Sequence, residues 1–281
     1  MKTAINCTYG QVAVVTGASS GIGLSVARQL AVRGFRVYGL SRREWLPPEI
    51  PGDGFVQALP CDVNDEVSAA EALALVARAE GGFGLLVNCA GFGIAGAVEE
   101  TSDTDARAQM ETNFFGTLRM CRLALPYLRA AGHGLIINTG SVAGFVAVPF
   151  QAHYSASKAA IDSVSLALDA EARRFGIRCV LVQPGDTQTG FTDARITARG
   201  AGRPDSPYAG VFERSVEGMA KSERSGDSPD RVAAAYVRLV FRRSPPPHTT
   251  PGKALYKAVG IASRLLPARL FRYIINLMYA S

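Results

Sequence analysis

The stretch VAVVTGASSGIG, residues 12–23, decides the fold of this chain. It opens with an apolar, β-branched run of strand length, turns through small residues and glycines, and is followed by helical spacing of apolar residues over 24–32. The stretch therefore predicts a strand, a glycine turn and a helix, which is the start of a βαβ unit. Such a turn lets backbone N–H groups approach a phosphate, and the helix N-terminus adds partial positive charge. The spacing Gly17-x-x-x-Gly21-x-Gly23 differs from the commonest dinucleotide pattern, and glycine turns also occur for steric reasons alone, so the turn needs support from the rest of the chain.

Strand-like and helical patterns alternate along most of the chain. This alternation predicts an α/β fold, a doubly wound parallel sheet with helices on both faces. A chain of 281 residues needs only one such domain, which we place at residues 1–250. The predicted strands lie near 35–40, 55–59, 85–87, 134–139 and 178–183, and the predicted helices at 67–79, 103–130, 153–175 and 228–243.

Two segments depart from this alternation. Residues 186–228 hold glycines, prolines and mixed charges with weak periodicity, which predicts a functional lid or a partly disordered loop. Residues 251–281 form a basic, apolar tail without an acidic residue, and its apolar residues recur at helical spacing. Two interpretations of the tail stay open. We favour helices that pack over a cleft or a subunit interface, and the alternative is an amphipathic segment on an anionic membrane surface.

Composition argues against several classes of protein. The net charge of +6 describes a moderately basic surface, and the chain has no known DNA- or RNA-binding motif, so we expect no nucleic-acid partner. The five cysteines form no C-x-x-C pair, and the three histidines form no suitable cluster, so we expect no metal site. The chain begins without the apolar core of a secretory signal and has no apolar run near the roughly 18 residues of a membrane span. We therefore expect a cytoplasmic protein with reduced cysteines.

Four residues form a candidate catalytic group. Tyr154 and Lys158 lie four apart in a predicted helix and share one face, although such a pair alone most often marks an ordinary helix surface. Ser141 follows a predicted buried strand, which is where loops of parallel sheets hold active sites. Asn113 lies in a helix interior, a position that disfavours asparagine unless its side chain has a partner.

Together these features resemble the short-chain dehydrogenase/reductase family in its small single-domain form. The glycine turn is similar to the family's cofactor turn, and the four candidate catalytic residues match its tetrad in order and spacing. Asn88-Cys89-Ala90-Gly91 resembles its N-x-A-G segment, with Cys89 where asparagine is commoner, and Pro184-Gly185 with Thr187 and Thr189 resembles its nicotinamide-side loop. The resemblance covers about residues 10–245 and implies a Rossmann-type fold that transfers a hydride between nicotinamide and a carbonyl or carbinol carbon.

The resemblance also implies a role for each residue. Tyr154 would be the general acid–base, while Lys158 would bind the nicotinamide ribose and, by its charge, lower the tyrosine's pKa. Ser141 would hydrogen-bond the substrate oxygen, and Asn113 would hold a water that links Lys158 to solvent. The expected cofactor contacts are Tyr154 and Lys158 with Gly17, Ser19, Ser20, Gly21, Ile22, Gly23, Arg42, Arg43, Asp62, Val63, Asn88, Ala90, Gly91, Pro184, Gly185, Thr187 and Thr189.

The end of the second strand predicts NADP(H) as the cofactor. An NAD site usually offers an acid there, whereas this chain has Arg42 and Arg43 and no acid until Glu44. A guanidinium group suits a 2′-phosphate, so we expect Arg42 as the main contact, with Ser20 as a further donor. The resemblance assigns Asp62 and Val63 to the adenine.

The predicted substrate is a lipophilic alcohol or ketone, because the loop after Ser141 is apolar. The chain is similar to hydroxysteroid and retinol dehydrogenases of the family, and fatty ketones fit the same description. Two alternatives remain, namely a 3-oxoacyl-carrier-protein reductase-like enzyme and a non-catalytic NADP-binding sensor. The family pattern implies a homodimer or homotetramer that pairs the helices at 103–130 and 153–175. Candidate pocket residues are those of the lid together with Gly93, Ile94, Val142, Ala143, Phe145, Val148, Pro149 and Phe150, of which both phenylalanines could equally be core.

Overall fold

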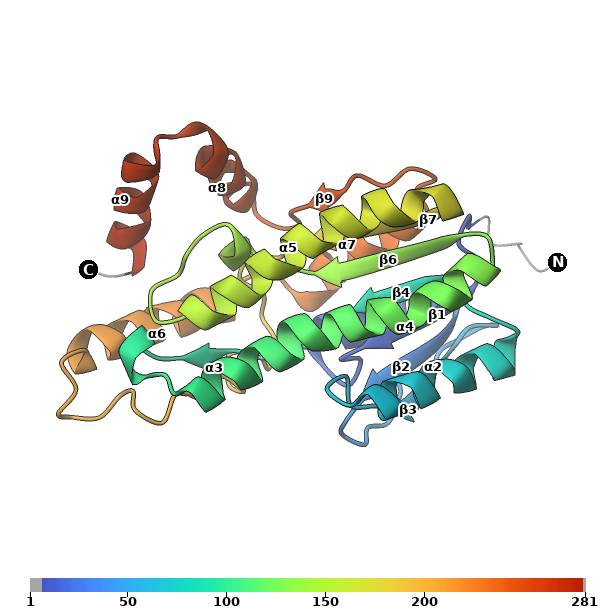
Figure 1. Ribbon diagram of the computed structural model, residues 1–281, viewed down its shortest axis with the longest axis horizontal. Helices are drawn as coiled ribbons and strands as arrows, with labels where there is room; N and C mark the ends of the chain where they lie inside the picture. The colour runs from blue at the N-terminus through green and yellow to red at the C-terminus, as the bar shows by residue number, and fades with distance from the viewer. Residues whose placement is uncertain (1–6, 280–281) are drawn as a thin grey trace.

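The computed structural model describes residues 7–279, with the side chains of 264, 272 and 276–279 left out, and Figure 1 shows its layers. Residues 1–6 and 280–281 lie outside this range. The first of these stretches belongs to the segment where we expect no secretory signal, and the second ends the predicted tail. A seven-stranded parallel sheet has the order β3-β2-β1-β4-β6-β7-β9. Its strands are β1 (Val12–Thr16), β2 (Arg36–Ser41), β3 (Phe55–Pro60), β4 (Leu85–Asn88), β6 (Gly134–Thr139), β7 (Ile177–Val182) and β9 (His248–Thr249).

Side chains of β1 point alternately to two apolar cores, one on each face of the sheet. Ala13 and Val15 pack with α1 (Gly21–Ala31) and α7 (Pro229–Val240). Val12 and Val14 pack with α2 (Glu66–Glu80), α4 (Thr117–Ala130) and α5 (Ala152–Ala172). Helices therefore cover both faces, as the alternating sequence predicted, and the expected doubly wound fold is confirmed (Figure 1).

The remaining elements surround the carboxyl ends of the strands. They are the short pair β5 (Ile94–Ala95) and β8 (Ile196–Thr197), α3 (Asp103–Met110), which continues through a π-helical turn at 111–116 into α4, then α6 (Ala209–Arg224), α8 (Ala254–Leu265) and α9 (Ala268–Tyr279).

Within residues 7–279, no helix combines the length and apolar character that crossing a bilayer requires.

The segment 186–228 is more regular than the sequence predicted. It contains β8 and the 16-residue helix α6, which buries Phe212, Ser215 and Met219. Only a narrow stripe of α6 is apolar, and charged residues and glycines interrupt it, so the helical period was hidden. Ser228 caps α7 as predicted, since its side chain accepts a hydrogen bond from the backbone N–H of Arg231.

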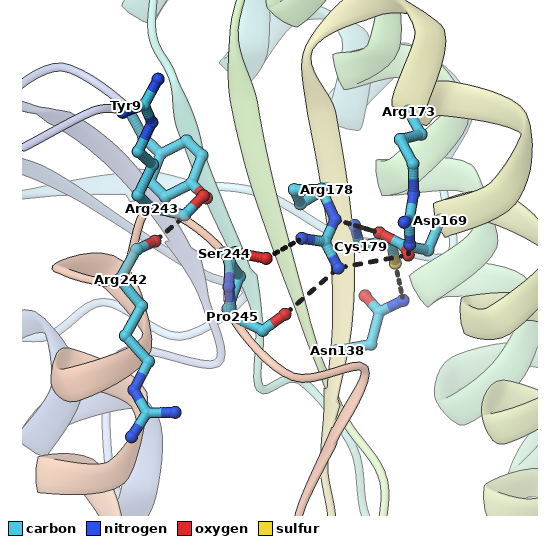
Figure 2. Close-up of polar contacts among 10 residues, drawn as sticks. All are labelled: Tyr9, Asn138, Asp169, Arg173, Arg178, Cys179, Arg242, Arg243, Ser244 and Pro245. Carbon is cyan, nitrogen blue, oxygen red and sulfur yellow. Dashed lines mark hydrogen bonds and ion pairs between the residues drawn. The ribbon is translucent and has the colours of Figure 1, made fainter.

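A buried ionic cluster holds α5 to β7 (Figure 2). The Asp169 carboxylate accepts hydrogen bonds from Arg178 Nε at 2.8 Å, the Cys179 backbone N–H at 2.9 Å and Arg173 Nη2 at 2.5 Å. Arg178 also donates to the Pro245 carbonyl at 3.1 Å, which ties in the segment between α7 and β9. The cluster fixes the helix that carries Tyr154 against the strand that leads to Pro184.

Candidate active site

The glycine turn leaves the N-terminus of α1 ready for an anion. Gly17 and Gly21 have positive φ values of 65° and 55°, and a Cβ on Gly17 would lie 2.8 Å from the backbone nitrogen of Ala90. Ser20, at the N-cap of α1, makes no capping hydrogen bond through its side chain. The first N–H groups of the helix therefore lack a side-chain acceptor, and an anionic group such as a phosphate would supply one.

A single cavity of about 1040 Å³ runs from this turn to Tyr154 and Lys158. It follows the carboxyl ends of the strands, including the point between β1 and β4 where the strand order reverses. Crevices at such switch points hold nucleotides in open α/β sheets. The volume and position fit a dinucleotide with space left for a substrate.

Two arginines flank the end of the cavity beside β2. Arg42 and Arg43 are exposed and line it, and Arg43 Nη2 donates to the Ser19 hydroxyl at 3.4 Å. Glu44, the first carboxylate after β2, is not among the lining residues. This end therefore presents positive charge and hydroxyls, the donor set that a phosphate requires.

Tyr154, Lys158 and Ser141 meet in the same cavity. Lys158 Nζ donates to the Thr139 carbonyl at 2.9 Å and lies 5.7 Å from the centre of the Tyr154 ring. Ser141 follows β6 by two residues and caps a short 3₁₀ turn, where its side chain accepts from the Ala143 N–H. One turn of α5 thus sets the tyrosine and lysine on the face turned toward the serine.

Asn113 is buried behind the cavity wall. Its side chain accepts from the Phe92 backbone N–H and donates to the Phe92 carbonyl, both at 3.0 Å, and it also donates to the Ser157 hydroxyl at 3.2 Å. These are the partners that an asparagine inside a helix was predicted to need. Gly91 separates it from the lysine, since a Cβ there would lie 3.1 Å from Asn113 Oδ1 and 3.7 Å from Lys158 Nζ.

Burial shifts both titrating groups toward their neutral forms. It raises the pKa of Tyr154 to about 12, although a hydrogen bond with Ser141 acts in the opposite direction. It also lowers the pKa of Lys158 to about 8. The sequence predicted a lowered tyrosine pKa. In the folded chain the pKa of Tyr154 is raised instead, because the loss of solvent around the phenol outweighs the effect of the charges near it.

Most of the predicted cofactor contacts line the cavity, but three of the predicted site residues do not. The Asp62 carboxylate accepts from the Asn64 N–H at 2.9 Å, Asn88 donates to Asn138 at 2.9 Å beneath the cavity, and Asn113 lies behind its wall. The residues brought together are Gly17, Ser19, Ser20, Gly21, Ile22, Gly23, Arg42, Arg43, Val63, Ala90, Gly91, Ser141, Tyr154, Lys158, Pro184, Gly185, Thr187 and Thr189.

The predicted substrate pocket is only partly present in the cavity lining. Phe150 packs on Tyr208 and Phe212, and Phe145 packs beside Val259, and neither phenylalanine lines the cavity itself. Val142, Ala143 and Val148 line the cavity, whereas Gly93, Ile94 and Pro149 do not.

The lid and the tail complete the cavity, as expected, with residues that the sequence did not single out individually. Tyr256 of α8 is buried over the loop after β7, and a Cβ on Gly185 would lie 2.4 Å from its ring. Helices α8 and α9 therefore cover the cleft, as the favoured interpretation of the tail predicted. No local pattern singled these residues out, because folding back over the sheet is a tertiary event. The added lining residues are Asp186, Gly190, Phe191, Ala194, Ile196, Met219, Ser222, Glu223, Lys253, Leu255, Tyr256, Val259 and Ile275.

The sheet and its cavity define a Rossmann-type protein that binds nucleotides, and sequence comparison narrows this class. The short chain dehydrogenase family matches residues 11–199. The chain belongs to the short-chain dehydrogenase/reductase family and is an oxidoreductase. Members of this family bind a nicotinamide cofactor.

Three relatives illustrate the match. The 3-ketodihydrosphingosine reductase of Bacteroides thetaiotaomicron is 39% identical over 270 residues, which cover 96% of this chain and 98% of that protein. A short-chain dehydrogenase from Streptomyces avermitilis superposes with a TM-score of 0.79 at 29% identity, over 94% of this chain and 97% of that one. A Burkholderia phymatum family member in complex with NAD superposes with a TM-score of 0.76 at 26% identity, over 91% and 92% of the two chains.

Proposed function

We propose that this protein is an NADP(H)-dependent oxidoreductase that reduces a long-chain, lipophilic ketone of the 3-ketodihydrosphingosine type. The observation that carries the proposal is the continuous cavity, which joins an arginine-flanked turn, a half-buried tyrosine and an apolar chamber. The 39% identical relative named for that reaction supports the substrate class, since the similarity includes the lid and the tail.

The cofactor end supports NADP(H) over NAD(H). Arg42 would bind the 2′-phosphate, with Arg43 and the Ser19 and Ser20 hydroxyls beside it, and no lining carboxylate follows β2 directly. The uncapped N-terminus of α1 would hold the pyrophosphate, and Lys158 would hold the nicotinamide ribose. When bound, the nicotinamide supplies the hydride that reduces the carbonyl carbon.

In the proposed mechanism, the chain's own residues position the carbonyl and supply its proton. The Tyr154 hydroxyl, held protonated by a pKa raised to about 12, donates its proton to the carbonyl oxygen. Ser141 hydrogen-bonds that oxygen as negative charge develops on it. Lys158 stabilises the tyrosinate that remains, and Asn113 keeps the Phe92 backbone and the adjacent wall in place.

Apolar side chains beside the tyrosine support a lipophilic substrate. One cluster combines the loop after Ser141, helix α6 and both tail helices, so part of this apolar wall comes from the family's variable region. An alkyl chain would gain about 0.8 kcal/mol per buried methylene there. The cluster includes Val142, Val146, Val148, Met219, Val259 and Ile275.

A substrate panel tests the proposal. The purified protein is incubated with NADPH or NADH and with 3-ketodihydrosphingosine, a steroid ketone, or a 3-oxoacyl chain on carrier protein, and nicotinamide absorbance is followed. We expect the highest kcat/KM for the long-chain ketone with NADPH. A higher value for the carrier-bound or steroid substrate would refute the substrate class, and a preference for NADH would refute the cofactor assignment.

Assembly and location are proposed on separate observations. We infer a homo-oligomer that pairs the α4 and α5 regions, because Phe115 and Leu166 are 46% and 42% exposed there.

The location of the protein is proposed from its cysteines and its tail. The five cysteines are free thiols, which supports a cytoplasmic location. The tail exposes Leu265 and Tyr273, at 77% and 61%, and its sequence is basic, which supports peripheral contact with an anionic membrane. Size-exclusion chromatography and vesicle sedimentation test the two contacts.

A further inference from the structure

One carboxylate in the catalytic cavity has no part in the proposed mechanism. Asp186 directly follows Pro184 and Gly185 and lines the cavity. The backbone N–H of Val142 donates to the Pro184 carbonyl at 2.9 Å, which sets this segment beside the loop that begins at Ser141. Asp186 therefore lies at the reacting end of the cavity.

No neighbouring cation balances the charge of this carboxylate. Asp186 Oδ2 accepts hydrogen bonds from the hydroxyls of Ser222 at 2.5 Å and Tyr256 at 3.4 Å. Among the side chains that the structure describes, no lysine or arginine pairs with Asp186, and none donates to its Oδ1. Lys253 also lines the cavity, but its Nζ donates to the Ser225 carbonyl at 3.1 Å.

The second acidic side chain of this region is already neutralised. Glu223 lines the cavity, but one of its oxygens pairs with Arg195 and the other accepts from the Thr192 hydroxyl at 2.7 Å. The Arg195 and Glu223 side chains are only 4% and 14% exposed, so this pair is a closed, internal one. Asp186 is thus the carboxylate of the reacting end that keeps an oxygen for a ligand.

We propose that Asp186 binds a primary ammonium group that the substrate carries next to its reacting carbonyl. The inference deepens the proposed function and rests on it. An ammonium group would supply the missing counter-ion and a charge-assisted hydrogen bond, while the alkyl chain extends along the apolar cluster. The cavity would then select long-chain amino ketones over neutral ketones of equal length.

A matched pair of substrates tests the selection. Turnover of 3-ketodihydrosphingosine is compared with that of its N-acetyl derivative, which keeps the chain and the carbonyl but loses the charge. Asp186→Asn keeps an acceptor for Ser222 and Tyr256, so we expect it to fold normally. We expect it to lower kcat/KM for the amine by about 10- to 100-fold and to change that for the N-acetyl ketone by less than about threefold. Equal losses for both substrates would overturn the inference.

A matched variant controls for the loss of one negative charge from the lid. Asp193→Asn removes a carboxylate that is 73% exposed, pairs with Arg224 and does not line the cavity. We expect it to turn over both substrates like the unmodified protein. A loss for the amine as large as that in Asp186→Asn would show an effect of overall charge and would also overturn the inference.

A binding measurement separates this inference from the proposed function. Octylamine and octanol are titrated calorimetrically into the NADP⁺-saturated protein. We expect Asp186→Asn to weaken octylamine at least about tenfold and to leave octanol unchanged. If that occurs in a protein that reduces neither ketone, the proposed function fails and the ammonium site stands. If the ketones are reduced and octylamine binds the variant as before, the ammonium site is refuted.

Discussion

Replacing Asp169 by asparagine tests the frame that positions the catalytic helix. The Asp169 side chain is 5% exposed, and that of its partner Arg178 is 14% exposed, so the substitution leaves a buried guanidinium without its counter-ion (Figure 2). Breaking a buried pair by removing one partner costs about 3–5 kcal/mol. An unfolding entropy of about 2.1 cal/mol/K per residue gives about 0.6 kcal/mol/K for 281 residues, so Tm should fall by about 5–8 °C.

The assay is calorimetric unfolding, with Asp103→Asn as the matched control. Asp103 is 95% exposed and pairs with Arg107 at 3.9 Å, so its loss should change stability by less than about 0.5 kcal/mol. Burial by itself would raise the pKa of Asp169, but hydrogen bonds from Arg178, Cys179 and Arg173 outweigh it and lower the pKa.

The lowered pKa gives the prediction a pH signature. Because the pKa is lower in the folded state, the stabilisation by Asp169 is complete above the carboxyl's unfolded pKa, near 3.9, and is lost as the pH falls through the folded value. The difference in Tm between the unmodified protein and Asp169→Asn should therefore be constant from about pH 5 to 8 and shrink in acid. A Tm change no larger than that of the control would refute the reasoning.

Three further predictions concern the cavity itself. Tyr154→Phe should lower turnover by about 10²- to 10⁴-fold and leave the NADPH Kd, measured by fluorescence titration, nearly unchanged; retention of most activity would contradict the proton donor assignment. Arg42→Ala should raise the Kd for NADPH about 10- to 100-fold and spare NADH, and equal losses in parallel titrations would defeat the 2′-phosphate site. Burial lowers the Lys158 pKa from 10.5 to about 8, so protonation of the lysine opposes folding at neutral pH. At about 1.4 kcal/mol per pKa unit, the unmodified protein should gain about 3 kcal/mol over Lys158→Met between pH 7 and 10.5, and urea unfolding that shows no gain would contradict the burial.

Local patterns predicted the frame of the molecule well. The alternation of strand-like and helical runs predicted the sheet strands β1, β2, β3, β4, β6 and β7 and the helices that cover them, because each signal is contained within one element. The Ser228 cap was also predictable, since a capping side chain contacts backbone only three residues away. Strand β9 has only two residues, too few for any periodic signal.

The same distinction between local patterns and long-range contacts applies to the candidate site. The glycine turn, Ser141, Tyr154 and Lys158 were predicted because their order and spacing resemble the family pattern, and the structure brings them to one cavity. Their proton affinities were not predictable, because the pKa of Tyr154 depends on how much solvent the folded chain removes from the phenol.

The sequence by itself determined the strands and helices of the parallel sheet, the glycine turn and the order of the candidate catalytic residues, since each is carried by a pattern within a short stretch of chain. Only the tertiary structure decided what surrounds the reacting end. Tyr256, far along the chain, packs on Gly185 and reaches Asp186, and Arg195 neutralises Glu223, while no described lysine or arginine side chain pairs with Asp186. The physical reason is that burial and charge balance arise from segments distant in sequence, and neither is encoded in the periodicity of any one of them.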